Sequence, residues 1–150
     1  MDTDTLFRRI VVGIDGSAAS LDALDTAAAI AAAHGSRLEA LAACEPLPLV
    51  DGYLPTELPA PLEDARRILD DAIAATFPDG PPAGLVLTPR EGNAARMLLD
   101  ASAEADLLVV GRRGHGAIAS LLLGSVSAAC TAHADCDVLV VRRSRTEGSR

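Results

Sequence analysis

Aromatic side chains are nearly absent from this sequence of 150 residues, which contains two Phe, one Tyr and no Trp. Apolar residues still make up 49% of the chain, so a core can form from Ala, Leu, Val and Ile. Proteins that bind single-stranded nucleic acid stack the bases on aromatic side chains. The shortage of aromatic residues therefore counts against that class of function.

Basic residues are also few, with 13 against 21 acidic residues and a formal net charge of -8. An acidic protein repels nucleic acid and anionic membranes, so we expect neither as a partner. No apolar run reaches the roughly 18 residues of a membrane-spanning helix. Because residues 1–5 lack the basic start of a signal peptide, we expect a cytoplasmic protein.

The three cysteines, Cys44, Cys130 and Cys136, are too few for a disulfide framework and suit a reducing compartment. Cys130, His133 and Cys136 have a spacing that can suggest a metal site, but no fourth ligand is evident. Cys130 falls on the apolar face of an expected helix. We therefore expect a buried thiol there and not a metal ligand.

Apolar runs typical of buried strands alternate along the chain with helix-like segments. The expected strands lie at 9–15, 37–44, 84–88, 106–110 and 138–141, and the expected helices at about 17–34, 62–77, 94–105 and 125–133. Ser17 and Asn93 are expected N-caps, and Gly35 is placed for a left-handed helix end. Residues 45–61 hold five of the nine prolines and predict a long loop whose role stays open.

This alternation predicts one α/β domain, with a core at about 8–143 and flexible termini. Right-handed crossovers favour a doubly wound, five-stranded parallel sheet in the order 3-2-1-4-5, with helices on both faces. Ligands of such folds bind where the strand order reverses, here between the first and fourth strands. Asp15 and Gly111 end those two strands, so we expect them to converge.

A glycine-rich pattern, Gly111-x2-Gly114-x9-Gly124-Ser125, follows the fourth strand and leads into a helix. Glycines allow close approach of the backbone, and N–H groups at a helix start can hold a phosphate. Arg112 and Arg113 within it suit the same ligand. The alternative is an ordinary strand-to-helix loop with solvated arginines, and Asp15 has the parallel alternative of a simple helix cap.

These residues resemble the universal stress proteins of the single-domain, ATP-binding type. The likeness covers about residues 8–143 and includes the segments 10–17, 91–93, 107–111 and 138–141 together with the full glycine pattern. The resemblance implies a Rossmann-like fold, similar to the adenine nucleotide alpha hydrolases. It also implies ATP as the bound cofactor, with Mg2+ as a candidate companion ion held through the phosphates and Asp15.

The resemblance also names the residues that would contact the nucleotide: Ile14, Asp15, Ala43, Gly111, Arg113, Gly114, Gly124, Ser125, Val126 and Ser127. It implies a homodimer through strand 138–141. Asp137 departs from the Pro that the family commonly carries before this strand.

Three functions remain at this point. The first is a nucleotide-responsive regulatory module of the stress response. The second is a slow ATPase or a phosphoryl or adenylyl transferase, although no catalytic base or Walker-type Lys accompanies the glycines. The third is an interaction module with an empty site. His115 has no visible base partner and is interpreted as a loop residue.

Overall fold

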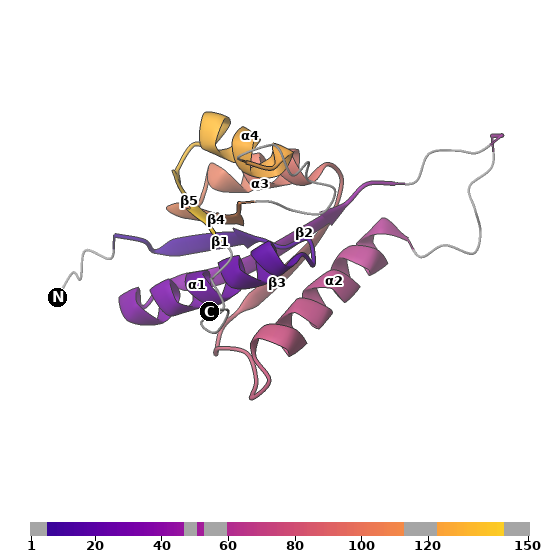
Figure 1. Ribbon diagram of the computed structural model, residues 1–150. Coiled ribbons are helices and arrows are strands. Elements are labelled where there is room, and N and C mark those ends of the chain that lie inside the picture. The colour runs from indigo at the N-terminus through magenta and orange to yellow at the C-terminus, as the bar shows by residue number, and fades with distance from the viewer. Residues whose placement is uncertain (1–5, 47–50, 53–59, 113–122, 143–150) are drawn as a thin grey trace, which may run out of the picture.

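The computed structural model describes residues 6–46, 51–52, 60–112 and 123–142. Its strands and helices, shown in Figure 1, alternate along the chain as β1 Arg9–Gly13, α1 Ala18–His34, β2 Arg37–Cys44, α2 Pro61–Thr76, β3 Val86–Glu91, α3 Ala94–Ser102, β4 Leu107–Gly111, α4 Ser125–His133 and β5 Asp137–Val141. The strands pair in parallel in the order β3-β2-β1-β4-β5. The predicted fold class and strand order are confirmed.

Two helices cover each face of the sheet, with α3 and α4 on one side and α1 and α2 on the other (Figure 1). The central strand β1 is buried on both faces, because Ile10 and Val12 pack under α1 while Val11 packs under α3 and α4. This explains why its sequence is a continuous run of β-branched residues and not an alternating one. The core thus consists of two apolar layers that fix the sheet between the helix pairs.

The predicted helix ends are confirmed where a cap marks them. The Ser17 hydroxyl accepts a hydrogen bond from the Ser20 N–H at 3.2 Å, and α1 begins at the next residue. Asn93 accepts from the Arg96 N–H at 3.1 Å and starts α3 in the same way. Gly35 ends α1 with φ 66°, in the left-handed region that favours glycine.

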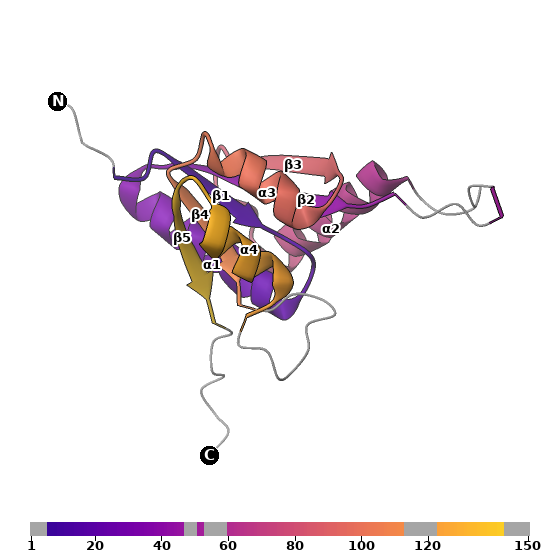
Figure 2. The same cartoon turned by 90° about the horizontal axis from the view of Figure 1, so that it is seen from above.

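The third strand lies further along the chain than the pattern predicts, at 86–91 and not at 84–88. Gly84 has φ 81° and belongs to the preceding turn. Pro89 lies inside the strand, opposite Ala42 of β2. A proline is tolerated there because β3 is an edge strand with one side unpaired, as Figure 2 shows for β3 and β5 at opposite edges of the sheet.

The Cys130 side chain is completely buried, and this burial raises the pKa of its thiol to about 11. The expectation of a buried thiol is confirmed. Within the described ranges, no three His, Cys, Asp or Glu side chains gather as metal ligands would. In the same ranges, no helix has the length and apolar character needed to cross a membrane.

Candidate functional site

The strand order reverses between β1 and β4, which pair directly from Ile10 with Leu107 to Val12 with Val109. Since all strands are parallel, the carboxyl ends of β1 and β4 lie at the same edge of the sheet. The segment that follows β1 and the residues that end β4 therefore lie side by side, although about 100 residues separate them in the sequence. The expected convergence is confirmed, and it defines the candidate site.

Asp15 follows β1 and shapes the turn into α1. Its Oδ1 atom accepts a hydrogen bond from the Ser17 N–H at 2.8 Å, and its own N–H donates to the Ser20 hydroxyl at 3.3 Å. The side chain is half-buried. Ser17 is the N-cap of α1, and the Asp15 carboxylate has the structural role of closing the turn before the helix. This structural role is compatible with a ligand role, because a carboxylate has room for several hydrogen bonds on its two oxygens.

The end of β4 is held closely by its neighbours. Gly111 packs so near to α1 that a Cβ atom built on it would lie 2.8 Å from the backbone of Ala19. The next residue, Arg112, donates its N–H to the Val141 carbonyl of β5 at 2.9 Å, and its own carbonyl accepts from the Gly124 N–H at 2.8 Å. The backbone of Arg112 is therefore bonded both to the end of β5 and to Gly124 at the start of the next helix.

Helix α4 begins at this junction without a side-chain cap, whereas α1 and α3 each have one. Gly124 is the N-cap residue and is buried, Ser125 is exposed, and Val126 is half-buried. The N–H groups of a first helical turn have no partner inside the helix and carry the positive end of the helix dipole. An anion at the carboxyl edge of the sheet would satisfy them.

Ser127 lies in the same turn but is 2% exposed. Its hydroxyl oxygen lies 2.9 Å from the Arg112 carbonyl and 3.1 Å from the Gly124 carbonyl. The hydroxyl proton is therefore used within the protein. The sequence contains no signal for this contact, because the partner lies 15 residues away across the glycine pattern.

Two further predicted contact residues lie beside the crevice, one just after β1 and one near the end of β2. Ile14 is 4% exposed, packs into the core layer under α1 and donates its N–H to the Leu41 carbonyl at 2.8 Å. Ala43 is half-buried near the end of β2. A ligand can reach these residues chiefly through the backbone. Arg113, Gly114 and His115 lie outside the described residues.

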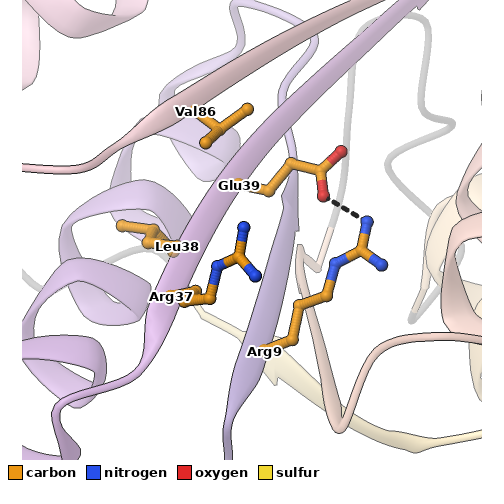
Figure 3. A pocket seen from close by; sticks show the side chains of 5 residues that line it. All are labelled: Arg9, Arg37, Leu38, Glu39 and Val86. Carbon is orange, nitrogen blue, oxygen red and sulfur yellow. Dashed lines mark hydrogen bonds and ion pairs between the residues drawn. The ribbon is translucent and has the colours of Figure 1, made fainter.

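A polar pocket that sequence reasoning missed lies at the opposite, amino-terminal edge of the sheet (Figure 3). Arg9 of β1 forms ion pairs with Glu39 of β2 at 2.7 Å and with the exposed Glu104 at 3.2 Å. Thr88 of β3 donates its hydroxyl to the same Glu39 carboxylate at 2.7 Å. The members of this network lie as far apart in the sequence as residues 9 and 104, so no local sequence pattern predicts it.

Burial raises the pKa of Glu39, but the hydrogen bonds from Arg9 and Thr88 outweigh it, and the pKa of this carboxyl lies below its ordinary value. The carboxylate is charged and satisfied by its neighbours. Because the network joins β1, β2 and β3, its evident role is to hold three strands together. It also lies away from the edge where doubly wound folds bind ligands.

The fold and the crevice define the class: an open, doubly wound α/β protein whose candidate site lies at the reversal of strand order. Within that class, the chain belongs to the universal stress protein family, whose model matches residues 6–142.

Among curated proteins, a universal stress protein of Thermus aquaticus is 38% identical over 141 residues, which span 91% of this chain and all of that protein. A universal stress protein of Mycolicibacterium smegmatis is 34% identical and matches 88% of this chain. This chain spans about half of the latter, since the match covers 47% of it.

Among solved structures, UspA of Lactobacillus plantarum superposes with a TM-score of 0.75 at 24% identity and covers 89% of this chain and 97% of its own. A universal stress protein in complex with cAMP superposes with a TM-score of 0.69 at 34% identity and covers 92% and 98%. The first likeness supports the fold. The second adds that a related protein of this size binds an adenine nucleotide.

Proposed function

We propose that this protein binds ATP in the crevice between β1 and β4 and acts in the cytoplasm as a nucleotide-responsive module of the stress response. The observation that carries the proposal is the start of α4, where the first turn lacks a side-chain cap and lies at the strand-order reversal beside Gly111. Backbone N–H groups in that position suit a phosphate chain. The related protein in complex with cAMP supports an adenine nucleotide as the ligand.

In this proposal, Gly124, Ser125, Val126 and Ser127 hold the phosphates through the backbone of their turn, and Asp15 faces the ribose. Ile14 and Ala43 offer backbone contacts to the nucleoside, and Gly111, Arg113 and Gly114 complete the site.

Mg2+ fits only as a companion of the phosphates. In the described part of the chain no ligand cluster could hold the ion by protein groups alone, and Asp15 supplies a single carboxylate. Mg2+ usually keeps several waters and binds through one or two carboxylates plus phosphates, which agrees with this arrangement.

The absence of lysine favours a regulatory role over rapid catalysis of phosphoryl transfer. All 13 basic residues are Arg, so the chain has no lysine to play the part of the P-loop lysine.

The second candidate function is a slow ATPase or a phosphoryl or adenylyl transferase. Native mass spectrometry of the purified protein separates these: retained ATP supports the module, ADP or a phosphorylated chain supports the enzyme, and an empty protein supports the interaction module. Calorimetric titration with ATP, ADP, AMP and cyclic AMP then ranks the ligands.

Asp15→Asn tests the carboxylate without removing the turn contact before α1, because the Asn carbonyl can still accept from the Ser17 N–H. We expect ATP binding to weaken by about 1.5–3 kcal/mol, the scale of a hydrogen bond to a charged group. If the ribose is the main partner, the loss extends to AMP and persists in EDTA. If Mg2+ is the main partner, the loss appears with ATP and Mg2+ and largely disappears in EDTA.

We expect the ribose to account for the larger share, since one carboxylate alone is a poor magnesium site. Calorimetry in both buffers measures the two contributions. Unchanged affinity for ATP and AMP in both buffers would leave Asp15 with only its structural role in the turn before α1.

We also propose a homodimer through β5. This strand lies at the sheet edge, and the side chains Val138 to Val141 are only partly buried. The opposite edge strand, β3, is interrupted by Pro89. An apolar edge strand invites pairing with a second copy.

Light scattering at micromolar concentration is expected to give twice the chain mass. Val140→Lys is expected to give a monomer, because it places a charge in the paired strand. Val86→Lys is the matched control: Val86 is 47% exposed on the other edge strand, so this variant keeps the dimer. Thermal unfolding verifies that both variants fold. A parent protein of monomeric mass would contradict the proposed interface through β5. A dimer that persists in Val140→Lys would contradict it as well.

A further inference from the structure

The backbone of Arg112 joins three elements at the carboxyl edge of the sheet. Its N–H donates to the Val141 carbonyl of β5 at 2.9 Å. Its carbonyl accepts from the Gly124 N–H at 2.8 Å and lies 2.9 Å from the Ser127 hydroxyl. The end of β4 is thereby tied to the end of β5 and to the first turn of α4.

Ser127 is the side chain that closes this junction. It is 2% exposed, so its hydroxyl is shielded from solvent. One proton serves two nearby acceptors, the Arg112 carbonyl at 2.9 Å and the Gly124 carbonyl at 3.1 Å. In both arrangements the Ser127 hydroxyl proton is already donated to a carbonyl of the protein before any ligand binds. It is therefore not available to a phosphate oxygen.

We infer that the Ser127 hydroxyl is a positioning group and not a phosphate ligand: it locks the first turn of α4 against the Arg112 carbonyl. The lock fixes the direction of the backbone N–H groups at the helix start. Preorganised donors bind an anion more tightly than donors that must first be ordered. The inference rests on the proposed ATP site and assigns to this hydroxyl a role different from that of its neighbours.

A simpler interpretation is a local hydrogen bond from Ser127 back to the Gly124 carbonyl, a common arrangement of Ser and Thr in helices. Helix α4 contains a matched case, since the exposed Thr131 hydroxyl donates to the Ala128 carbonyl at 3.0 Å. Thr131 has the same sequence offset to its acceptor, but its side chain lies on the solvent side of the helix. Comparing the two residues therefore separates the lock on Arg112 from a local helical bond.

The experiment compares the parent protein with Ser127→Ala, Ser127→Cys and Thr131→Ala. Amide hydrogen exchange of the nucleotide-free proteins is measured by NMR at Arg112 and Gly124, and affinities for ATP and adenosine are measured by calorimetry. Ser127→Ala is expected to speed exchange at both amides and to weaken ATP about 3- to 10-fold, the range of one neutral hydrogen bond. Adenosine, which lacks phosphates, is expected to bind as it does to the parent.

Ser127→Cys has nearly the size of serine with a weaker donor, so it is expected to lie between the parent and Ser127→Ala. Thr131→Ala is expected to match the parent in exchange at both amides and in ATP affinity. Thermal unfolding of each variant shows whether the helix as a whole survives.

Weaker ATP binding with unchanged exchange at Gly124 would indicate a direct phosphate contact and overturn the inference. Faster exchange with unchanged ATP affinity overturns it as well, because the lock would then not serve the site. A parent protein that fails to bind ATP rejects the proposed function, while exchange at Arg112 and Gly124 still decides whether Ser127 forms the lock.

Discussion

Gly124→Val is expected to lower the affinity for ATP by about 100-fold or more. Gly124 is the N-cap residue of α4, and a branched side chain there occupies the space through which a phosphate reaches the first-turn N–H groups. Losing two hydrogen bonds to a charged group, at roughly 1.5 kcal/mol each, removes about 3 kcal/mol of binding free energy. Since about 1.4 kcal/mol corresponds to a factor of ten, the affinity falls by about two orders of magnitude.

The loss should come from the ligand and not from the backbone. Gly124 has φ −67° and ψ 165°, an extended conformation that valine also adopts. Its N–H still donates to the Arg112 carbonyl in the variant. Because Gly124 is buried, Gly124→Ala provides a graded comparison with a smaller side chain.

Calorimetry measures the affinity of both variants, and circular dichroism with thermal unfolding establishes that they fold. We expect Gly124→Ala to lie between the parent and Gly124→Val. A folded Gly124→Val protein that binds ATP as tightly as the parent would reject the site at α4.

Much of the fold could be predicted from the sequence because local and global signals agree. The helix starts after Ser17 and Asn93 and the end at Gly35 follow from short-range chemistry, and the structure confirms each one. The strand order follows from the alternation of elements and from the handedness of crossovers. These are rules that need no knowledge of individual contacts.

The bounds of β3 could not be predicted because they depend on its place at the sheet edge. Pro89 ends a strand on local grounds, since proline lacks the N–H of a ladder hydrogen bond. Only the strand order shows that β3 is an edge strand with one unpaired side, where a proline is tolerated. Local propensity and tertiary position disagree here, and tertiary position prevails.

The candidate site was predictable in outline and not in its contacts. The topology alone places Asp15 near the end of β4. The bond from Ser127 to Arg112 and the ion pair from Arg9 to Glu39 depend on packing between segments that lie far apart in the sequence. Hydrophobic periodicity in a single sequence does not predict such contacts.

Gly111 shows how one residue can satisfy two explanations. Its place in the glycine pattern suggests close approach of a ligand. The structure adds a packing reason, because a Cβ atom at this position would lie 2.8 Å from the carbonyl carbon, the oxygen and the Cβ of Ala19 in α1. Helix α1 can therefore lie directly on the end of β4 only while residue 111 is glycine.

Gly111→Ala is accordingly expected to lower the free energy of unfolding by about 2–3 kcal/mol, the upper part of the range for overpacking a core. For a chain of this size that loss corresponds to a fall in melting temperature of roughly 4–12 °C. The cost is high because the atoms in the way belong largely to the helix backbone, which cannot rotate aside. Denaturant unfolding and calorimetry measure both quantities.

Gly13→Ala is the matched control, because Gly13 also ends a strand and a Cβ atom added to it would also meet an atom at 2.8 Å. There the nearest atom is a terminal methyl of Leu98, which can change rotamer at small cost. We expect Gly13→Ala to cost less than about 1 kcal/mol. Both substitutions reduce the entropy of the unfolded chain equally, so their difference isolates the contact with α1. Equal stabilities of the two variants would show that α1 shifts freely on β4, and that Gly111 is needed for the ligand alone.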